Sequence, residues 1–276
     1  YEGIHDIGFM IYCSYGNGYR LTKNEEYLPI INKTSETLCK RYNSKVRTLL
    51  SWGDLKDTIT QEYHNTIIDN MMNLEMLMFS AQKFNNNYFA EISKSHADRT
   101  IESHIRPDFS TFHVVEFDKN NGAIVKQKTH QGYADSSDWA RGQTWGMYSY
   151  RMMYEYTKDP KYLDLACKLS DHFIARLPDD LVPYWDFDDP NVPNTYRDAS
   201  AGAIAACALF DLSELVEDKD LSLKYYNIAM GLVNKLTTDE YLAKEDYYRC
   251  LILHSVGHWQ RKTEIDTNIN YADYYY

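Results

Sequence analysis

One aspartate stands where a carboxyl group is unusual. In the stretch NTIIDNMMNLEML, helical spacing places Asp69 on the same face as Met72, Asn73 and Met76. A carboxylate on an apolar face is costly to bury unless it is hydrogen-bonded or has a chemical role. Burial favours the protonated form of a carboxyl group, which suits a general acid at neutral pH. The alternative is a hydrogen-bonded structural aspartate near a helix start, and the residues alone leave both open.

A second carboxylate, Asp6, follows His5 at the start of another apolar helical stretch, Ile7 to Met10. Two carboxylates at the starts of two inner helices would point into the mouth of a helical assembly. Paired carboxylates are typical of enzymes that cleave glycosidic bonds. The competing interpretation is that Asp6 caps its own helix, which is a common use of an aspartate at this position.

Polar side chains also flank a predicted β-hairpin, FHVVEFDKNNGAIVKQ, whose turn signal is Asn121-Gly122. His113 lies at one end of this hairpin and His130-Gln131 lies at the other. We therefore expect these side chains to be close together and to be possible hydrogen-bond donors to a ligand. Isolated histidines are more often structural. His254 and His258 are the one pair with a metal-ligand spacing, in a loop-like stretch that gives weak support for a metal.

The stretch SSDWARGQTWGMYSY places Arg141 between Trp139 and Trp145 at the start of an apolar helical pattern. Core helices rarely begin with so many polar groups. The net charge of the chain is −11, and no basic run accompanies it, which argues against a nucleic-acid partner. An acidic small substrate would need a local cation, and Arg141 is a candidate.

The elements that must position these residues are helical hairpins. Four similar segments have a polar turn rich in Asn, Asp and Lys, then a Tyr or Leu, then apolar residues at helical spacing; Tyr27, Tyr88 and Tyr162 are their anchor tyrosines. An open solenoid and a closed toroid both fit this pattern. The varied loops between hairpins favour the toroid, because elaborate loops at one end of a helical barrel commonly carry a site. We expect an all-α protein with a small β-hairpin insertion, forming a single domain over residues 1–276.

The bulk composition sets further limits. The 25 tyrosines suit broad polar binding surfaces, sugar clefts among them. The five cysteines are scattered singly and predict buried free thiols, without a disulfide framework or a zinc site. No stretch reaches the length of a membrane span. The chain begins inside an apolar helical pattern and ends abruptly, so we expect residues to be absent at both ends.

A resemblance adds to this interpretation. From Ile4 to Tyr276 the chain contains, in order, HDIGFM, IIDNMMNLEML, TFHVVEFD, THQGYADSSDWARGQTWG, VPYWDFDDP, YRDASAGAIAA and INYADYYY. Together these resemble glycoside hydrolase family 88, the unsaturated glucuronyl hydrolases, and WARGQTWG with the upstream HQG is quite specific. The resemblance implies an (α/α)6 toroid. The unsaturated rhamnogalacturonyl hydrolases are a sister family with the same fold. Their counterpart of WARGQ usually lacks the glutamine, so Gln143 favours the glucuronyl group.

The resemblance also implies residue roles. Asp69 matches the catalytic acid/base aspartate of the family, and Asp6 matches the second essential aspartate beside the sugar hydroxyls. Arg141 would face the sugar carboxylate, and Trp145 would offer a ring for stacking. The remaining positions that match substrate contacts are His5, Trp52, His113, His130 and Gln131. No metal or organic cofactor is implied.

The sequence therefore predicts a bacterial enzyme, in the cytoplasm or periplasm, that removes a 4,5-unsaturated glucuronic acid from lyase-generated oligosaccharides. We expect a monomer or weak homodimer with no nucleic-acid or membrane partner. The alternatives are an unsaturated rhamnogalacturonyl hydrolase and a non-catalytic carbohydrate-binding module of helical repeats. The first helical hairpin of the family and its final helix have no match here, which puts activity of this segment alone in doubt. In the stretch HSVGHWQRK, His258 and Gln260 replace a serine and a lysine of relatives that accept sulfated disaccharides, so we expect sulfated substrates to be poor.

Overall fold

The computed structural model describes residues 3–55, 62–244 and 249–276. They form two compact units. The N-terminal unit comprises Tyr1–Ile105, Val114–Gln127 and Glu155–Lys158, and the C-terminal unit comprises Arg106–His113, Lys128–Tyr154 and Asp159–Tyr276. The expectation of one domain over residues 1–276 stays a prediction.

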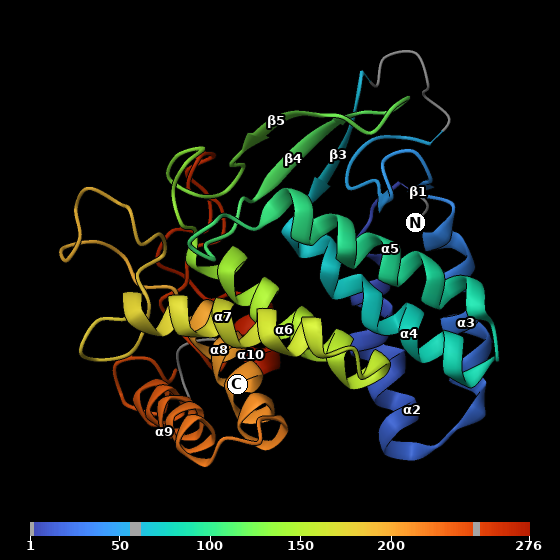
Figure 1. The fold of residues 1–276 in the computed structure, drawn as a ribbon. Coiled ribbons are helices and arrows are strands. Elements are labelled where there is room, and N and C mark those ends of the chain that lie inside the picture. The colour runs from blue at the N-terminus through green and yellow to red at the C-terminus, as the bar shows by residue number, and fades with distance from the viewer. Residues whose placement is uncertain (1–2, 56–61, 245–248) are drawn as a thin grey trace. The chain divides into compact units, whose positions relative to one another are not determined.

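The N-terminal unit is built on helices that surround α4. Its α-helices are α1 (Ile7–Ile11), α2 (Asn17–Thr22), α3 (Leu28–Cys39), α4 (Leu74–Lys83) and α5 (Asn87–His104). Three shorter turns complete it: the π-helical η1 (Tyr12–Gly16) and the 3-10 helices η2 (Glu25–Tyr27) and η3 (Ile68–Asn73). Helix α4 packs against α1, α3 and α5 (Figure 1). Its side chains at Leu74, Met76, Leu77 and Met78 are buried, which places α4 in the core of the unit.

Strands are few and short. β1 (Tyr42–Asn43) and β2 (Thr48–Leu49) pair with each other, and a second sheet has the order β3 (Tyr63–Ile67), β4 (Val114–Asp118), β5 (Ile124–Lys128). β4 and β5 confirm the predicted hairpin. Gly122 adopts φ 76°, and a Cβ there would lie 2.3 Å from the Lys45 carbonyl oxygen, so this turn requires glycine. The sequence did not predict β3, which pairs antiparallel with β4.

The C-terminal unit is built around α8. Its helices are α6 (Ala140–Thr157), α7 (Pro160–Arg176), α8 (Ala199–Leu215), α9 (Lys219–Leu236) and α10 (Asn270–Tyr275). Small residues make α8 almost entirely buried, and α7, α9 and α10 pack against it (Figure 1). The prediction of an all-α protein with a small strand insertion is confirmed.

The four similar segments owe their likeness to helix capping. At the start of α5 the Asn86 side chain accepts from Tyr88 N at 3.2 Å, and at the start of α7 Asp159 accepts from Lys161 N at 3.1 Å. Asn24 and Asp218 do the same for η2 and α9. Such caps satisfy amide groups that have no partner within the helix. The anchor tyrosines are less alike than predicted: Tyr162 is 1% exposed, Tyr27 is half-buried and Tyr88 is 53% exposed.

The bulk predictions are met in part. Cys39 is buried, whereas the other four cysteines are half-buried free thiols, so the expectation of buried thiols was too broad. Within the described ranges, every helix is too short or too polar to cross a bilayer.

Candidate active site

Asp69 lies in a 3-10 turn and not in an α-helix. The chain leaves β3 in an extended conformation at Ile67 and winds into η3, where Asp69 is half-buried. The Asn73 Oδ1 atom accepts from Phe9 N at 2.9 Å, and a Cβ on Gly8 would lie 2.7 Å from the same oxygen. The absence of a side chain at Gly8 therefore lets α1 approach the segment that carries Asp69. The predicted α-helix at Asp69 was wrong, because a six-residue 3-10 turn comes before α4. Met72, Asn73 and Met76 are buried, as predicted.

Asp6 pairs with His5 directly before α1. His5 Nε2 lies 2.9 Å from Asp6 Oδ1, and His5 Nδ1 lies 2.9 Å from the Ser51 carbonyl oxygen. A carbonyl oxygen only accepts, so His5 Nδ1 carries a hydrogen and donates it to Ser51. The Asp6 side chain is 47% exposed and makes no capping bond to α1 within the described residues. The capping interpretation of Asp6 is not what the structure shows.

Uncharged groups connect the segments of the N-terminal unit. Ile67 N donates to Ser51 Oγ at 2.9 Å, and Ser51 Oγ donates to Asn70 Oδ1 at 2.9 Å. The half-buried Trp52 donates its backbone N–H to Asn65 Oδ1, and its ring lies edge-on to His5 at 6.5 Å. The structure thus brings His5, Asp6 and Trp52 into one network with the turn that carries Asp69.

In the C-terminal unit, His113 and the His130-Gln131 loop meet as expected. His113 Nδ1 accepts from His130 N at 3.3 Å and from Gln131 N at 3.2 Å. An accepting Nδ1 leaves the hydrogen of neutral His113 on Nε2, which makes that atom a donor. The His113 ring stacks on Trp139 at 4.3 Å between centroids, so its plane is fixed.

His130 and His258 form a pair of neutral imidazoles. Their Nε2 atoms are 3.1 Å apart, so one ring must donate and the other accept. Burial, followed by the nearby His258, Arg261 and Lys128, lowers the pKa of His130 to about 4. Burial and then Arg261 lower the pKa of His258 as well. His254 and His258, which have a metal-ligand spacing, have different partners: His254 Nδ1 contacts Asp266 Oδ1 at 2.7 Å, and His258 contacts His130.

Arg141 is 1% exposed and joins three segments of the C-terminal unit. Its Nη1 donates to Asp198 Oδ2 and to the Val256 carbonyl oxygen, each at 2.7 Å, and its Nη2 donates to the Gly257 carbonyl oxygen at 2.8 Å. Gln131 Nε2 donates to the same Gly257 oxygen at 2.8 Å. Arg141 therefore ties the start of α6 to the loop that contains Gly257.

Trp145 is 3% exposed, with the edges of Tyr271 and Tyr275 at 5.9 Å. Its predicted stacking on the sugar, and the predicted contact of Arg141 with the sugar carboxylate, stay predictions.

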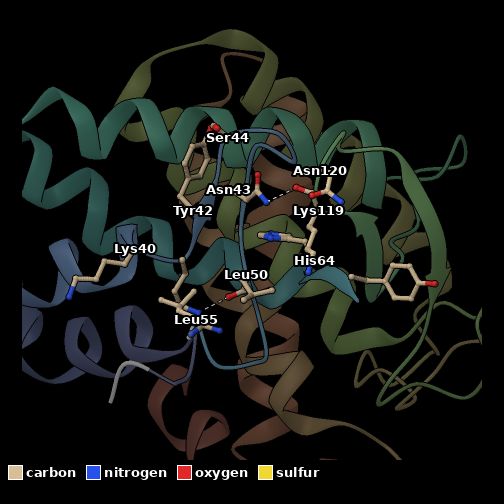
Figure 2. Close-up of a pocket in the computed structure, with 11 residues that line it drawn as sticks. Lys40, Tyr42, Asn43, Ser44, Leu50, Leu55, His64, Lys119 and Asn120 are labelled. Atoms are coloured by element: carbon tan, nitrogen blue, oxygen red, sulfur yellow. Dashed lines mark hydrogen bonds between the residues drawn. The ribbon is translucent and has the colours of Figure 1, made fainter. Parts of the chain in front are cut away.

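A pocket of about 580 Å³ lies in the N-terminal unit, apart from these groups (Figure 2). His64 lies on its wall, and burial followed by the Arg41 charge lowers the pKa of His64 to about 4. No predicted site residue is among its described lining residues, which are Lys40, Arg41, Tyr42, Asn43, Ser44, Leu50, Leu55, Tyr63, His64, Lys119 and Asn120.

No family model matches the chain. Among curated proteins, an unsaturated glucuronyl hydrolase of Formosa agariphila is 41% identical over 276 residues, covering 99% of this chain and 67% of the relative. An unsaturated chondroitin disaccharide hydrolase of Streptococcus pyogenes serotype M1 is 33% identical over 273 residues, covering 99% of this chain and 68% of the relative. Among solved structures, an unsaturated glucuronyl hydrolase specific for heparin matches with a TM-score of 0.94 and 41% identity, covering 100% of this chain and 73% of that one.

The chain belongs to the unsaturated glucuronyl hydrolases. It spans about two thirds of the length of these relatives. The family resemblance, the class of glycoside hydrolase and the mostly helical fold predicted from the sequence are thereby confirmed. The assignment of individual site residues in this unsaturated glucuronyl hydrolase still rests on the resemblance and on the geometry above.

Sequence reasoning missed the partners that hold the site residues in place. Asp198 bonds Arg141 from 57 positions further along the chain, and it also caps α8 through Ser200 N and Ala201 N. Trp139, which was noted only as a neighbour of Arg141, supports both His113 and the Arg141 guanidinium, which lies 4.6 Å from its ring. The sequence signal for Asp198 was the pattern DAS before an alanine-rich helix. This pattern predicts that Asp198 caps the helix, but it does not predict the ion pair of Asp198 with Arg141.

Proposed function

We propose that this protein removes a 4,5-unsaturated glucuronic acid from the non-reducing end of oligosaccharides that polysaccharide lyases produce. The observation that carries the proposal is the 41% identity to an unsaturated glucuronyl hydrolase over 99% of the chain. Because the net charge of the chain is −11, an anionic sugar must be attracted by local hydrogen-bond donors, such as the group around His113 and Arg141.

The reaction we propose is hydration of the C4=C5 vinyl ether. Asp69 protonates C4, water adds at C5, and the resulting hemiketal opens and releases the remaining sugar. One carboxyl group can act as acid and then as base because the two proton transfers occur in sequence. The half-buried position of Asp69 supports this role, because burial favours the protonated form of a carboxyl group. Asp6, whose carboxyl is 47% exposed and lies 2.9 Å from His5 Nε2, would contact the sugar hydroxyls.

Binding roles follow the same resemblance. His113 would donate from Nε2, Gln131 and His130 would contact the sugar, and Arg141 would face its carboxylate. The aromatic contacts would come from Trp52 and Trp145, with His5 as a further contact. The ion pair with Asp198 holds Arg141 in one position, which fixes the segment that would recognise the charged sugar.

The test follows the ultraviolet absorbance of the C4=C5 bond with unsaturated disaccharides from chondroitin, hyaluronan and heparin lyase digestion. Loss of absorbance with release of the second sugar is the expected result, and a rhamnogalacturonan-derived disaccharide should react more slowly. Unchanged absorbance at every enzyme concentration would contradict the proposal.

A further inference from the structure

The segment VPYWDFDDP carries three aspartates that the proposed chemistry does not use. Asp186, in its middle, is fully buried in the C-terminal unit. Its Oδ2 accepts from Tyr133 N at 2.8 Å and from Ser137 Oγ at 2.7 Å, and its Oδ1 accepts from Asp188 N at 3.0 Å. Two of its three bonds therefore hold residues of the loop over 129–137.

This loop carries His130 and Gln131 directly before the point where Asp186 binds it. Between them and Tyr133 lies Gly132, where a Cβ would be 3.0 Å from Asp186 Oδ2 and 2.8 Å from Thr129 Oγ1. Gly132 N donates to Thr129 Oγ1 at 2.9 Å. The carboxylate is thus in close contact with the backbone of the loop, one residue after the proposed sugar contacts.

The energetics also point to a specific use of this carboxylate. Burial raises the pKa of Asp186 to about 6, against the opposing effect of its hydrogen bonds to Tyr133 N and Ser137. A hydrophobic residue of similar size would avoid this cost but would leave the Tyr133 amide without its acceptor.

Asp189, in the same segment, supplies an internal comparison. It is 3% exposed and accepts from Trp185 Nε1 at 2.7 Å, from Asn191 N at 3.0 Å and from Thr195 Oγ1. These partners all belong to residues 185–195, which include none of the proposed site residues. The two aspartates thus share burial and bonding but hold different loops.

We propose that Asp186 is a positioning residue for the reaction: its carboxylate fixes the loop over 129–137 so that His130 and Gln131 are presented to the sugar. This inference rests on the proposed function. It assigns to VPYWDFDDP a role in substrate binding that acts through the loop and not through contact with the substrate.

The experiment compares Asp186→Ala, Asp186→Asn and Asp189→Ala for Tm and for steady-state kinetics on the best unsaturated disaccharide. Asp186→Ala should lower kcat/KM by about ten- to a hundredfold, mainly through KM, because a displaced contact weakens binding of the sugar. Asp186→Asn keeps an oxygen for Tyr133 N and Ser137 Oγ, so it should recover most of the loss. Asp189→Ala should lower Tm to a similar extent as Asp186→Ala and leave KM unchanged.

Equal kcat/KM for Asp186→Ala and the wild type, or an equal rise in KM for Asp189→Ala, would overturn the positioning role. If Asp186→Ala fails to fold, Ser137→Ala removes one of the three bonds to Asp186, together with the bonds of Ser137 Oγ to Ala134, and should raise KM. An unchanged KM in that variant would also overturn the positioning role. A wild-type protein that consumes no unsaturated disaccharide would overturn the proposed function and this role together, which separates the two failures.

Discussion

The two units use aspartate in opposite ways. In the N-terminal unit, Asp6 is 47% exposed and lies beside His5, and Asp69 is half-buried. In the C-terminal unit, Asp186 and Asp198 are fully buried. A carboxyl group that water and a ligand can reach is able to exchange a proton, whereas one whose oxygens are occupied by protein donors holds the chain in place. Exposure and bonding therefore separate the proposed catalytic aspartates from the scaffolding ones, although the residue type is the same.

Histidines also differ in their burial and in their partners. His96 and His104 are buried in the N-terminal unit, where burial lowers their pKa values to about 3 and about 4. In the C-terminal unit, the hydrogen bond to Asp138 at 2.8 Å raises the pKa of His172. Burial thus favours the neutral form of a histidine, whereas a carboxylate partner favours its charged form.

The largest expected effect comes from Asp69→Asn. The amide has the same shape but cannot protonate carbon, so turnover should fall on the order of a hundredfold or more while the fold is kept. Initial rates and Tm measure both properties. Asp164→Asn, at a surface ion pair with Lys168, is the matched control and should keep normal rates. Near-normal activity in folded Asp69→Asn would remove Asp69 from the mechanism.

Arg141→Ala should affect both binding and stability. The change leaves the buried Asp198 carboxylate without this cation, which typically costs about 3–5 kcal/mol. It also frees the Gly257 carbonyl oxygen that Gln131 shares, so KM should rise. Arg141→Lys keeps a charge for Asp198 but loses the planar fork, and should recover stability better than binding. Unchanged KM in Arg141→Ala would show that the sugar carboxylate is bound elsewhere.

Acid should loosen the N-terminal unit first. The unfolded chain protonates His96 and His104 near pH 6.5, whereas the folded chain resists protonation down to about pH 3 to 4. The stability of the folded chain is therefore greatest above pH 6.5 and falls as the pH drops through this window, by up to roughly 3 to 5 kcal/mol for each histidine. Hydrogen exchange, corrected for intrinsic rates, should show α5 losing protection before α8.

Asp186 changes the stability of the folded chain with pH in the opposite direction. Its raised pKa contributes stability that is fully present below pH 3.8 and is lost as the pH rises through about 6. Asp186→Asn should therefore remove a pH-dependent contribution to the unfolding free energy between these values. Equal loss of protection in α5 and α8 at every pH would contradict the contrast between the units.

The smallest expected effect concerns sulfated substrates. Gln260 Nε2 donates to the carbonyl oxygens of Gly132 and Tyr133, at 2.8 and 2.9 Å, and His258 is bonded to His130. These groups are therefore engaged with the protein, and a sulfate prefers a fixed positive charge. Unsaturated chondroitin disaccharide should react faster without sulfate. Gln260→Lys should lower the ratio of the unsulfated to the sulfated rate by a few-fold, about the effect of one added charge. Faster turnover of the sulfated form by the wild type would contradict this.

Local signals in the sequence predicted much of the fold. Apolar periodicity and the Asn or Asp turns gave the helical hairpins, because caps such as Asn86 and Asp159 act within two residues. Asn121-Gly122 gave the β-hairpin, and the hairpin in turn predicted that His113 and His130 are close. The 3-10 turn at Asp69 was missed because side chains three residues apart lie on the same face in both an α-helix and a 3-10 helix, so a short stretch does not distinguish the two.

Long-range partners were not predictable from one sequence. β3 is a strand because it pairs with β4, about fifty residues later, and short strands depend on such pairing. The bonds from Arg141 to Asp198 and from Tyr133 to Asp186 join residues 57 and 53 positions apart. Nothing in the local pattern selects these carboxylates from the 40 acidic residues of the chain.

The most direct test of the account asks where solvent enters the product. If Asp69 protonates C4 and water adds at C5, turnover in heavy water places deuterium at C4 of the released uronic acid. Oxygen-18 from solvent then enters the carbonyl at C5, and the glycosidic oxygen stays on its anomeric carbon. A two-carboxylate glycosidase would place solvent oxygen at C1 and leave C4 unlabelled. Solvent oxygen at C1 in the product collected before chemical exchange would contradict the hydration mechanism.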